Sequence, residues 1–391
     1  MKNIAGWRKL EFGEFVTQSA KKPTGDFELR CVELEHVEPA TGKLLGWREG
    51  KSSEGSKLSF RKDDVLFGKL RPYLRKAWLA QFDGMCSSEF WTLTSPANAC
   101  DQRWLKQLVL SDLFSRATFA SSGSKMPRAD WSIVASYPFQ LPTLSEQRKI
   151  ADILTTWDDA IGKIDVLIDA KTRRKKALMQ QLLSGKLRFP AFAKSSWKKV
   201  RMSEVLTRVF RPIEWTADKP LSLVSLRRRY GGLFRRPDVL GADYKTQDLH
   251  DLKDTDFLIS KRQVVHGAWA LVTPEFAGCH VSKEYTIFVN QAPDKLDMTF
   301  FAWLAQTPHM TRLARVASTG VHIEKLIFDP EVFLRESIRI PTSIEEQRRI
   351  AAILDTADDE LKLLRTQRTA LDQQKRGLMQ RLLTGKLRVA V

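Results

Sequence analysis

Two basic stretches contain the side chains in this chain that are best suited to chemistry. FGKLRPYLRKAW runs from Phe67 to Trp78, and SLRRRYGGLFRRP runs from Ser225 to Pro237 around a Tyr-Gly-Gly turn. Arginine forks can grip phosphate oxygens or read guanine edges, and a glycine turn lets the backbone approach a nucleic acid closely. Both stretches therefore suggest nucleic-acid contacts, with a solvated surface loop as the alternative in each case.

Two short loops place small hydroxyl and glycine residues beside a basic side chain. They are SSGSKMPR, from Ser121 to Arg128, and STGVHIEK, from Ser318 to Lys325, and they occupy equivalent places along the chain. Such loops suit contacts in a DNA groove, and ordinary turns are the alternative. The residues predicted to bind DNA are Lys69, Arg71, Arg75, Lys76, Ser122, Ser124, Lys125, Arg227, Arg228, Arg229, Tyr230, Arg235, Thr319 and His322.

The sequence shows none of the usual enzyme signatures. SGKL at Ser184 lacks the upstream glycine and the Ser/Thr of a phosphate-binding loop, and neither GxGxxG nor GxSxG occurs. Asp238 with DYK at Asp243 has the composition of a nuclease metal site, but its short spacing favours a solvated turn. Cys279-His280 lacks further ligands nearby, which favours a packed pair. We therefore predict no catalytic residue, no metal site and no cofactor.

The charge of the chain indicates a polyanionic partner. The net charge is +18 over 391 residues, with a pI near 9.8, and every segment of the chain has an excess of basic residues. The four cysteines are scattered without a CxxC pair, as is typical of a reducing compartment. No apolar run approaches the roughly 20 residues of a membrane helix, and the N-terminus lacks the apolar core of a signal peptide. A cytoplasmic protein is expected.

The chain contains an internal repeat. Residues 147–189 align without a gap with residues 347–389, and 20 of these 43 positions are identical. The repeat keeps GKLR at Gly185 in register with GKLR at Gly385, which chance similarity between amphipathic helices would not do. The sequence therefore contains a duplication.

Each repeat predicts one long helix. A proline (Pro142, Pro341) precedes a capping box (TLSE, ending at Glu146; SIEE, ending at Glu346), and the GKLR glycine follows at the expected C-terminal cap. About 40 helical residues would extend ~60 Å at 1.5 Å per residue.

The apolar positions of both helices follow steps of four and three, which predicts a heptad seam packed on another long helix rather than on a broad core. Internal pairing of the two copies is favoured, and homodimerisation is the alternative. Lys171, Lys175, Arg368 and Lys375 interrupt the seam. One aspartate of each pair, Asp158-Asp159 and Asp358-Asp359, is expected to cap a partner helix or to form a salt bridge with it. The basic run from Lys171 to Lys176 is read as a charged surface face, with a phosphate contact or an acidic partner as the alternative. The seam residues predicted at the helix-pairing or partner interface are Ile150, Leu154, Trp157, Ile161, Ile164, Ile168, Leu178, Leu182, Ile350, Leu354, Leu361, Leu364, Leu371, Leu378 and Leu382.

Each helix follows a segment that mixes short β-rich runs with turns, and WRKLEFGE at Trp7 is similar to WKKVRMSE at Trp197. The expected order is a first globule (1–141), a helical spacer (142–189), a second globule (190–340) and a second spacer (341–391). When the two globules are compared by sequence, LFGKLRPYL of the first corresponds to VVHGAWALV of the second, from Val264. The second segment lacks the Arg-Pro pair.

With these motifs, nearly the whole chain resembles the specificity (S) subunit of type I restriction-modification systems. The resemblance is carried by LPTLSEQRKIADIL with LMQQLLSGKLRF, by their second copies, and by VELEHVEPATGKL, DDVLFGKLRPYLRKAW and DGMCSSEFWTL in the first globule. It implies an α+β fold in which two α/β target recognition domains are separated by two long conserved helices, pairing as an antiparallel coiled coil with internal pseudo-twofold duplication.

The resemblance also implies a function. Each recognition domain would read one half of an asymmetric, bipartite site on double-stranded DNA, and the helices would set the spacing and dock two methyltransferase (modification) subunits. Methylation, translocation and cleavage would reside in the modification and restriction (translocase-nuclease) subunits, as part of phage defence. The alternatives are a non-catalytic coiled-coil adaptor for another DNA-acting effector, and the specificity subunit of a related system with fused methyltransferase and nuclease.

Overall fold

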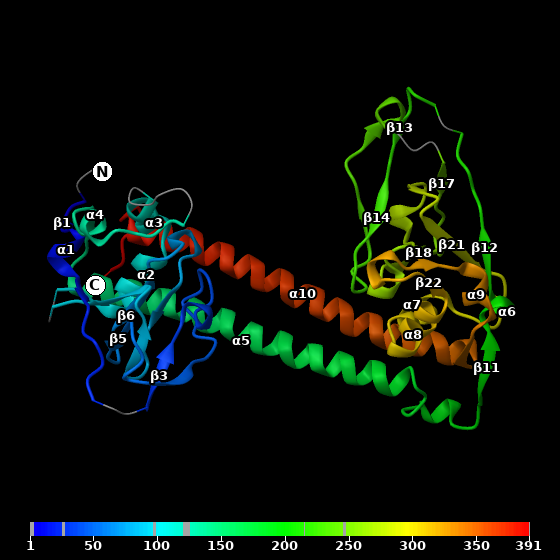
Figure 1. The fold of residues 1–391 in the computed structure, drawn as a ribbon, viewed down its shortest axis with the longest axis horizontal. Helices are drawn as coiled ribbons and strands as arrows, with labels where there is room; N and C mark the ends of the chain where they lie inside the picture. Colours follow the sequence, from blue (N-terminus) through cyan, green and yellow to red (C-terminus); the bar gives the residue numbers. More distant parts are fainter. Residues whose placement is uncertain are drawn as a thin grey trace. The chain divides into compact units, whose positions relative to one another are not determined.

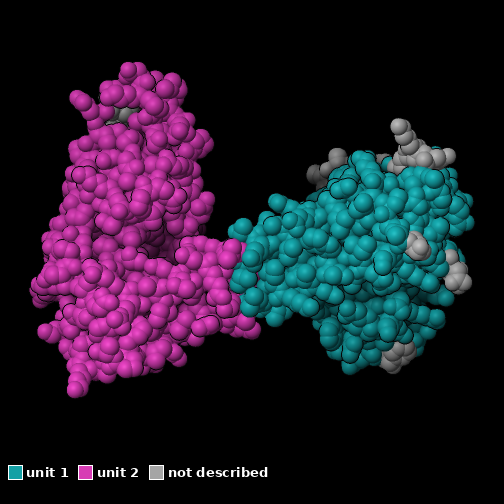
Figure 2. Space-filling model, turned by 180° about the vertical axis from the view of Figure 1, so that it is seen from behind, with its two compact units in different colours: residues 1–167, 364–391 teal, residues 168–363 magenta. Residues whose placement is uncertain are grey.

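The computed structural model describes residues 4–25, 28–96, 99–119, 126–214, 216–244 and 248–390. It divides into two compact units: unit 1 comprises residues 1–167 and 364–391, and unit 2 comprises residues 168–363 (Figure 2). The division crosses both long helices, so each unit holds one globule, the beginning of one long helix and the end of the other. In the described part of the chain, no helix is both long enough and apolar enough to cross a membrane.

The two predicted long helices are present as α5 (Leu144–Leu182) and α10 (Ile344–Leu383) (Figure 1). At the start of α5, the Thr143 hydroxyl accepts a hydrogen bond from the backbone N–H of Glu146 at 3.4 Å, as the capping box predicts. Beyond the two ends, Gly185 and Gly385 have φ values of 72° and 65°, a left-handed conformation that glycine adopts without strain. The predicted start and stop signals are confirmed.

In unit 1, ion pairs between α5 and α10 define an antiparallel arrangement. Lys375 Nζ lies 2.5 Å from Asp158 Oδ1, and Arg368 Nε lies 3.2 Å from Asp165 Oδ1, so numbers rise on one helix as they fall on the other. Lys106, from the globule, also lies 3.1 Å from Asp158 Oδ2. The basic residues that interrupt the apolar seam are thus satisfied by carboxylates of the partner helix.

Unit 2 repeats this arrangement with the helices exchanged. Lys175 pairs with Asp358 and Lys171 pairs with Glu360, again in antiparallel order. The prediction that one aspartate of each Asp-Asp pair bridges to the other helix is therefore confirmed for Asp158 and Asp358. Lys175 also lies over the ring of Trp303, 4.8 Å from its centroid.

The apolar seam packs on the globule cores as well as on the other long helix. The prediction from its heptad period, that it packs only on another helix, is therefore wrong. Ile150 and Leu154 belong to the core of the first globule together with Leu382, and Ile350 and Leu354 belong to that of the second. Because each helix starts directly after a globule strand, its first turns complete that globule's core. Eight seam positions are buried: Ile150, Leu154, Ile161, Leu182, Ile350, Leu354, Leu361 and Leu382. The half-buried ones are Trp157, Ile164, Ile168, Leu178, Leu364, Leu371 and Leu378.

The repeated Glu-Gln-Arg and Gly-Lys-Leu-Arg motifs are bound to each other between the two copies. In unit 1, Arg388 Nε donates to Glu146 Oε1 at 2.8 Å. In unit 2, Arg188 donates from Nε and Nη2 to the two carboxylate oxygens of Glu346, at 2.9 and 2.8 Å. The indole N–H of Trp7 completes the first site at 3.0 Å. The capping-box glutamates thus serve mainly as buried anchors for the end of the other helix.

The first globule contains two four-stranded sheets, in the orders β2-β9-β6-β7 and β4-β3-β8-β5, and a separate β1-β10 pair. Every pairing is antiparallel except β3 with β8. The elements are β1 (Arg8–Glu11), α1 (Phe12–Phe15), β2 (Thr17–Ser19), β3 (Glu28–Val32), β4 (Arg48–Lys51), β5 (Lys57–Phe60), β6 (Val65–Gly68), β7 (Ala77–Leu79), β8 (Gly84–Ser87), β9 (Phe90–Thr94), α2 (Gln102–Leu110), α3 (Asp112–Phe119), α4 (Trp131–Ala135) and β10 (Pro138–Leu141).

The second globule contains the sheet β12-β21-β18-β19, the pair β11-β24 and four further two-stranded pairs, β13-β16, β14-β15, β17-β20 and β22-β23. The elements are β11 (Trp197–Arg201), α6 (Met202–Val205), β12 (Leu206–Val209), β13 (Pro220–Leu221), β14 (Val224–Leu226), β15 (Leu233–Arg235), β16 (Val239–Leu240), β17 (Leu249–Asp251), β18 (Phe257–Ser260), β19 (Trp269–Leu271), β20 (His280–Ser282), β21 (Tyr285–Asn290), α7 (Met298–Ala305), α8 (Pro308–Val316), β22 (Ser318–Thr319), β23 (Ile327–Phe328), α9 (Pro330–Arg335) and β24 (Ser337–Pro341).

One sheet has the same strand order in both globules, so the duplication extends beyond the helices. β2-β9-β6-β7 corresponds to β12-β21-β18-β19, and β1-β10 corresponds to β11-β24. Strand β6 therefore matches β18, which corrects the comparison of LFGKLRPYL with the segment from Val264. The true counterpart is LISKRQVVH, from Leu258, and Gly267 (φ 71°) stands where the first globule has Arg75 (φ 49°).

Candidate nucleic-acid interface

In the first globule, the turn after β6 lies against the segment that leads into α4. The backbone N–H of Arg71 donates to the carbonyl of Pro127 at 2.7 Å, and that of Ala129 donates to the carbonyl of Lys69 at 2.8 Å. The turn contains η2 (Pro72–Leu74), flanked by Arg71 and Arg75 in the left-handed conformation, with φ values of 51° and 49°. Two stretches singled out from the sequence are thus brought together, although Ser122, Ser124 and Lys125 lie outside the described residues.

The four basic residues of this turn have different surroundings. The Arg71 side chain is exposed and Lys69 is half-buried. Arg75 Nη1 lies 2.6 Å from Asp112 Oδ1, and Lys76 Nζ donates to the carbonyl of Leu34 at 2.6 Å. Arg75 and Lys76 are therefore engaged with their own globule, which leaves Arg71 as the exposed basic side chain of the turn.

Arg128 joins the same surface, although it is not among the residues predicted from the sequence to bind DNA. Its guanidinium makes two hydrogen bonds to Glu89, each of 3.0 Å, and these bonds raise its pKa above the ordinary value. Its position next to Leu70, to which it is bridged, is set by the fold. Because Glu89 occupies the bidentate edge of this guanidinium, a phosphate or a base edge would have to displace the carboxylate or use the remaining N–H groups.

In the second globule, the corresponding turn meets two of the selected loops. Arg228 Nη2 lies 3.1 Å from Glu324 Oε2, and His266 Nε2 lies 3.3 Å from Glu324 Oε1. The backbone N–H of Arg229 donates to the carbonyl of His266 at 2.7 Å. The contacts connect the Arg-rich turn, η5 (Val264–His266) and η7 (Ile323–Lys325), which are far apart in the sequence.

Several side chains predicted to bind DNA are accessible to a partner here. Arg229, with a φ of 57°, Thr319 and His322 are exposed, and His322 Nδ1 accepts from the backbone N–H of Glu324 at 3.3 Å. The Arg228–Glu324 pair is about half exposed (52% and 47%), so it contributes roughly 0–1 kcal/mol and can open easily. A DNA phosphate could therefore replace the carboxylate at low cost.

Tyr230 lies half-buried within the globule. Its hydroxyl is 2.7 Å from Thr311 Oγ1, and its ring stacks on Trp269 with centroids 6.2 Å apart. Arg227 lies over Phe234, 4.5 Å from the ring centroid, and Arg235 Nη2 donates to the carbonyl of Glu275 at 2.5 Å. These residues shape and support the β14-β15 hairpin.

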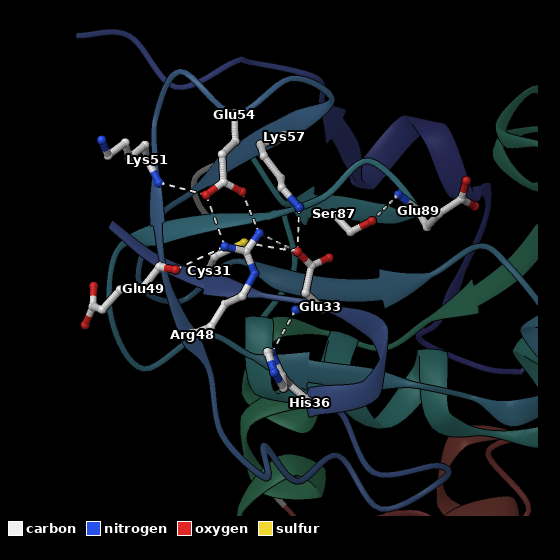
Figure 3. A network of polar contacts seen from close by, with 10 residues as sticks. All are labelled: Cys31, Glu33, His36, Arg48, Glu49, Lys51, Glu54, Lys57, Ser87 and Glu89. Atoms are coloured by element: carbon white, nitrogen blue, oxygen red, sulfur yellow. Dashed lines mark hydrogen bonds and ion pairs between the residues drawn. The ribbon is translucent and has the colours of Figure 1, made fainter. Parts of the chain in front are cut away.

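Arg48 and Lys57 form a second basic cluster in the first globule, and both side chains pair with carboxylates of the same globule (Figure 3). Glu33 Oε1 accepts from Lys57 at 2.5 Å and from Arg48 at 3.1 Å, and Arg48 also binds Glu54 Oε2 at 2.5 Å. Burial, with the charge of Glu33, raises the pKa of the neighbouring Cys31 thiol to about 11. The thiol is thus a protonated member of a network that joins strands β3, β4 and β5.

The remaining sequence candidates have ordinary surroundings. Asp238 Oδ1 lies 3.3 Å from the Ser222 hydroxyl, and Cys279 is buried. His280 Nδ1 faces Asp251 Oδ1 at 3.7 Å, and burial lowers the pKa of the imidazole. Within the described ranges, no group of three or more His, Cys, Asp or Glu residues could hold a metal ion.

Comparisons with known proteins agree on one family. A family model described as type I restriction modification DNA specificity domain matches residues 47–167. The MjaVIII type I restriction enzyme specificity subunit of Methanocaldococcus jannaschii is 25% identical over 327 residues, 78% of this chain and 75% of that protein. The EcoDI specificity subunit of Escherichia coli is 29% identical over 169 residues, 41% of this chain and only 37% of that protein.

Solved structures show the same fold along the chain. The S subunit of a type I restriction-modification system from M. genitalium has a TM-score of 0.59 and 12% identity, and covers 98% of this chain and 97% of its own. The HsdS subunit from Thermoanaerobacter tengcongensis has a TM-score of 0.51 and 19% identity, over 99% of both chains. At these identities the similarity concerns the fold.

Proposed function

We propose that the chain, which matches a type I restriction modification DNA specificity domain over residues 47–167 and is similar to type I specificity subunits, is such a subunit and reads a bipartite, asymmetric target on double-stranded DNA. The first globule (1–141) would read one half-site and the second (190–340) the other. The helical segments (142–189 and 341–391) would set the number of unread base pairs and dock two methyltransferase subunits, and through them restriction subunits. Catalysis would reside in those partners, in the cytoplasm.

The repeated topology is the feature that carries this proposal. Both globules build the same four-stranded sheet, and both bring the turn after its central strand against the loop before α4 or α9. Two equivalent basic surfaces in one chain suit a DNA site with two half-sites, since duplex DNA presents its own local twofold symmetry. The globule sequences differ at these surfaces, which suits half-sites that differ in sequence.

Within these surfaces we propose Arg71, Arg228, Arg229 and His322 as DNA contacts, with Arg75 as a further candidate. Lys125, predicted from the sequence, is also a candidate but lies outside the described residues. Alanine at an arginine that reads a base should cost ~1–3 kcal/mol and relax one position of the target. Alanine at a phosphate contact should weaken all DNA sequences evenly and flatten the dependence of affinity on salt. A binding titration with target and scrambled duplexes distinguishes the two roles for each variant.

Methylation-aware sequencing of host DNA, with this gene intact and deleted, tests the function directly. We expect N6-methyladenine to disappear from one asymmetric two-part motif in the deletion strain and to return when the gene is restored. An unchanged methylation pattern, together with DNA binding that shows no preferred sequence, would favour the adaptor. A pull-down that recovers no methyltransferase would then reject the docking proposal as well.

A further inference from the structure

A small basic cavity lies in unit 2, next to the candidate interface. Its volume is about 30 Å³, and its polar lining residues are Arg208, His250, Lys261, Lys283, Tyr285 and Thr286. One water needs roughly 10–15 Å³ by this measure, so the cavity accommodates about two small polar atoms. Pockets for drug-sized ligands start near ~300 Å³, so this cavity is too small for such a ligand. Its volume suits the free oxygens of one phosphate.

The cavity wall contains a buried hydroxyl without a partner. The Thr286 side chain on β21 is 1% exposed, and among the described residues its Oγ1 has no hydrogen-bond partner. Nδ1 of His250, on β17, likewise lacks one. Buried polar atoms are normally satisfied, because an unpaired one loses its hydration without compensation. An occupant that accepts a hydrogen bond would satisfy the hydroxyl.

The charges around the cavity favour an anion. Lys261 Nζ donates to the carbonyl of Lys283 at 2.5 Å, and Arg208 lies over the exposed Phe210 ring, 4.2 Å from its centroid. Burial, followed by the charge of Arg208, lowers the pKa of Lys261. Two carboxylates are nearby: Asp248 lies 3.3 Å from Lys283 Nζ and 3.4 Å from His250 Nε2, and Glu284, which pairs with Arg262, also acts on Lys261. The four cations Arg208, Lys261, Arg262 and Lys283 thus outnumber the two carboxylates, and the surroundings of the pocket are net positive.

The backbone of Lys261 connects this pocket to the proposed DNA surface. Its N–H donates to the carbonyl of Glu284 at 2.9 Å, and its carbonyl accepts from the N–H of Phe328 at 2.9 Å, at the end of the His322 loop. The next residue, Arg262, pairs with Glu284 at 2.6 Å. A DNA strand that contacts the loop could therefore present a phosphate to the pocket.

At the equivalent described positions, the first globule has different residues. The registers of the two equivalent sheets place Gln18 where the second globule has Arg208, and Trp91 where it has Thr286. Lys69 matches Lys261, but a neutral amide and an indole replace the guanidinium and the hydroxyl. The pocket therefore distinguishes the second globule from the first.

We propose that Arg208, Lys261, Lys283 and the Thr286 hydroxyl form a pocket for one phosphate oxyanion, and that the DNA backbone supplies it. The choice of DNA as the source rests on the proposed function. The pocket would anchor the second half-site without reading its sequence, since phosphate contacts position a protein on DNA and base contacts specify the sequence.

The test uses the full chain, a duplex that carries the methylated motif and a random duplex. In Thr286→Val, an isosteric change removes the unpaired hydroxyl, so the free protein should melt at or above the wild-type temperature. The same variant should bind both duplexes about tenfold more weakly, because a hydrogen bond to a charged oxygen is lost. These opposite effects separate a ligand-binding role from a structural one.

Lys261→Gln should reduce the slope of log affinity against log salt by about 0.9, the value for one phosphate contact. Lys199→Gln, an exposed lysine on β11, removes the same charge and should leave the slope unchanged. A neutral methylphosphonate linkage at the contacted phosphate should weaken the wild type but not Lys261→Gln. Wild-type affinity in Thr286→Val, or an unchanged slope in Lys261→Gln, would overturn the proposal.

A thermal shift with inorganic phosphate identifies the source of the anion. If phosphate stabilises the wild type but not Thr286→Val, while no methylphosphonate position affects binding, the pocket takes free phosphate and the DNA assignment is wrong. The proposed function fails separately, through a wild type that does not prefer the motif duplex. Preference for the motif with no effect of either pocket variant rejects this inference alone.

Discussion

Replacing Asp158 should destabilise unit 1 strongly, because this carboxylate compensates a buried lysine. Asp158 accepts from Lys375 Nζ at 2.5 Å, from Gln107 Nε2 at 2.9 Å and from Lys106 Nζ at 3.1 Å. The Lys375 side chain is only 8% exposed, so it cannot regain water without moving. In Asp158→Ala, the ammonium group would stay buried without its main counterion.

Removing one partner of a buried ion pair lowers the free energy of unfolding by about 3–5 kcal/mol, because the other charge stays buried without compensation. For a unit of this size, each kcal/mol lowers the melting temperature by roughly 2–4 °C, so a loss of about 6–20 °C is expected. The double variant Asp158→Leu/Lys375→Met should recover most of the loss, because it removes both charges and fills the space with apolar atoms.

Thermal and urea denaturation, followed by circular dichroism, measure these changes. Asp358→Ala in unit 2 is the matched control. Its partner Lys175 is 19% exposed and keeps its contact with Trp303, so a smaller loss is expected. A loss below about 1 kcal/mol in Asp158→Ala, or a double variant no more stable than the single one, would refute the reasoning.

Three further perturbations test other features. Arg188→Ala should destabilise unit 2 by about 3–5 kcal/mol in urea, since the Glu346 carboxylate is 1% exposed; a loss within the range of surface pairs would contradict this. Burial alone would raise the pKa of Asp158, but the neighbouring lysines outweigh it and hold that pKa below 3.8. The stability that this carboxylate contributes is therefore complete above pH ~4 and is lost as the pH falls through the lower pKa of the folded state. An acid titration of Asp158→Asn should not show this loss, because the amide does not titrate. Gly320→Ala would place a Cβ 2.7 Å from the Lys325 carbonyl oxygen, at a φ of 151°, so the backbone of the loop must shift. We expect weaker DNA binding and a lower melting temperature, and wild-type binding would show that the loop is not a contact.

Local patterns in the sequence determined the long helices and their pairing. The caps, the glycine stops and the spacing of apolar residues are properties of neighbouring residues, so α5 and α10 follow from the chain alone. The duplication indicated that the helices pair with each other. The roles of Asp158 and Asp358 followed as well, because a charge on a buried seam requires a partner on the facing helix.

Tertiary structure decided which residues meet at the candidate interface. Glu324 joins Arg228 and His266 from distant parts of the chain, and only the sheet register equates Lys261 with Lys69. Several basic residues that look alike in sequence differ in the fold: Arg75 is ion-paired within its globule, whereas Arg71 is exposed. The sequence specifies which side chains carry charge, but the number of unpaired cations at a surface depends on contacts between distant parts of the chain. These contacts are set by the pairing of short β-strands, and a short strand has little local sequence signal from which its pairing could be predicted.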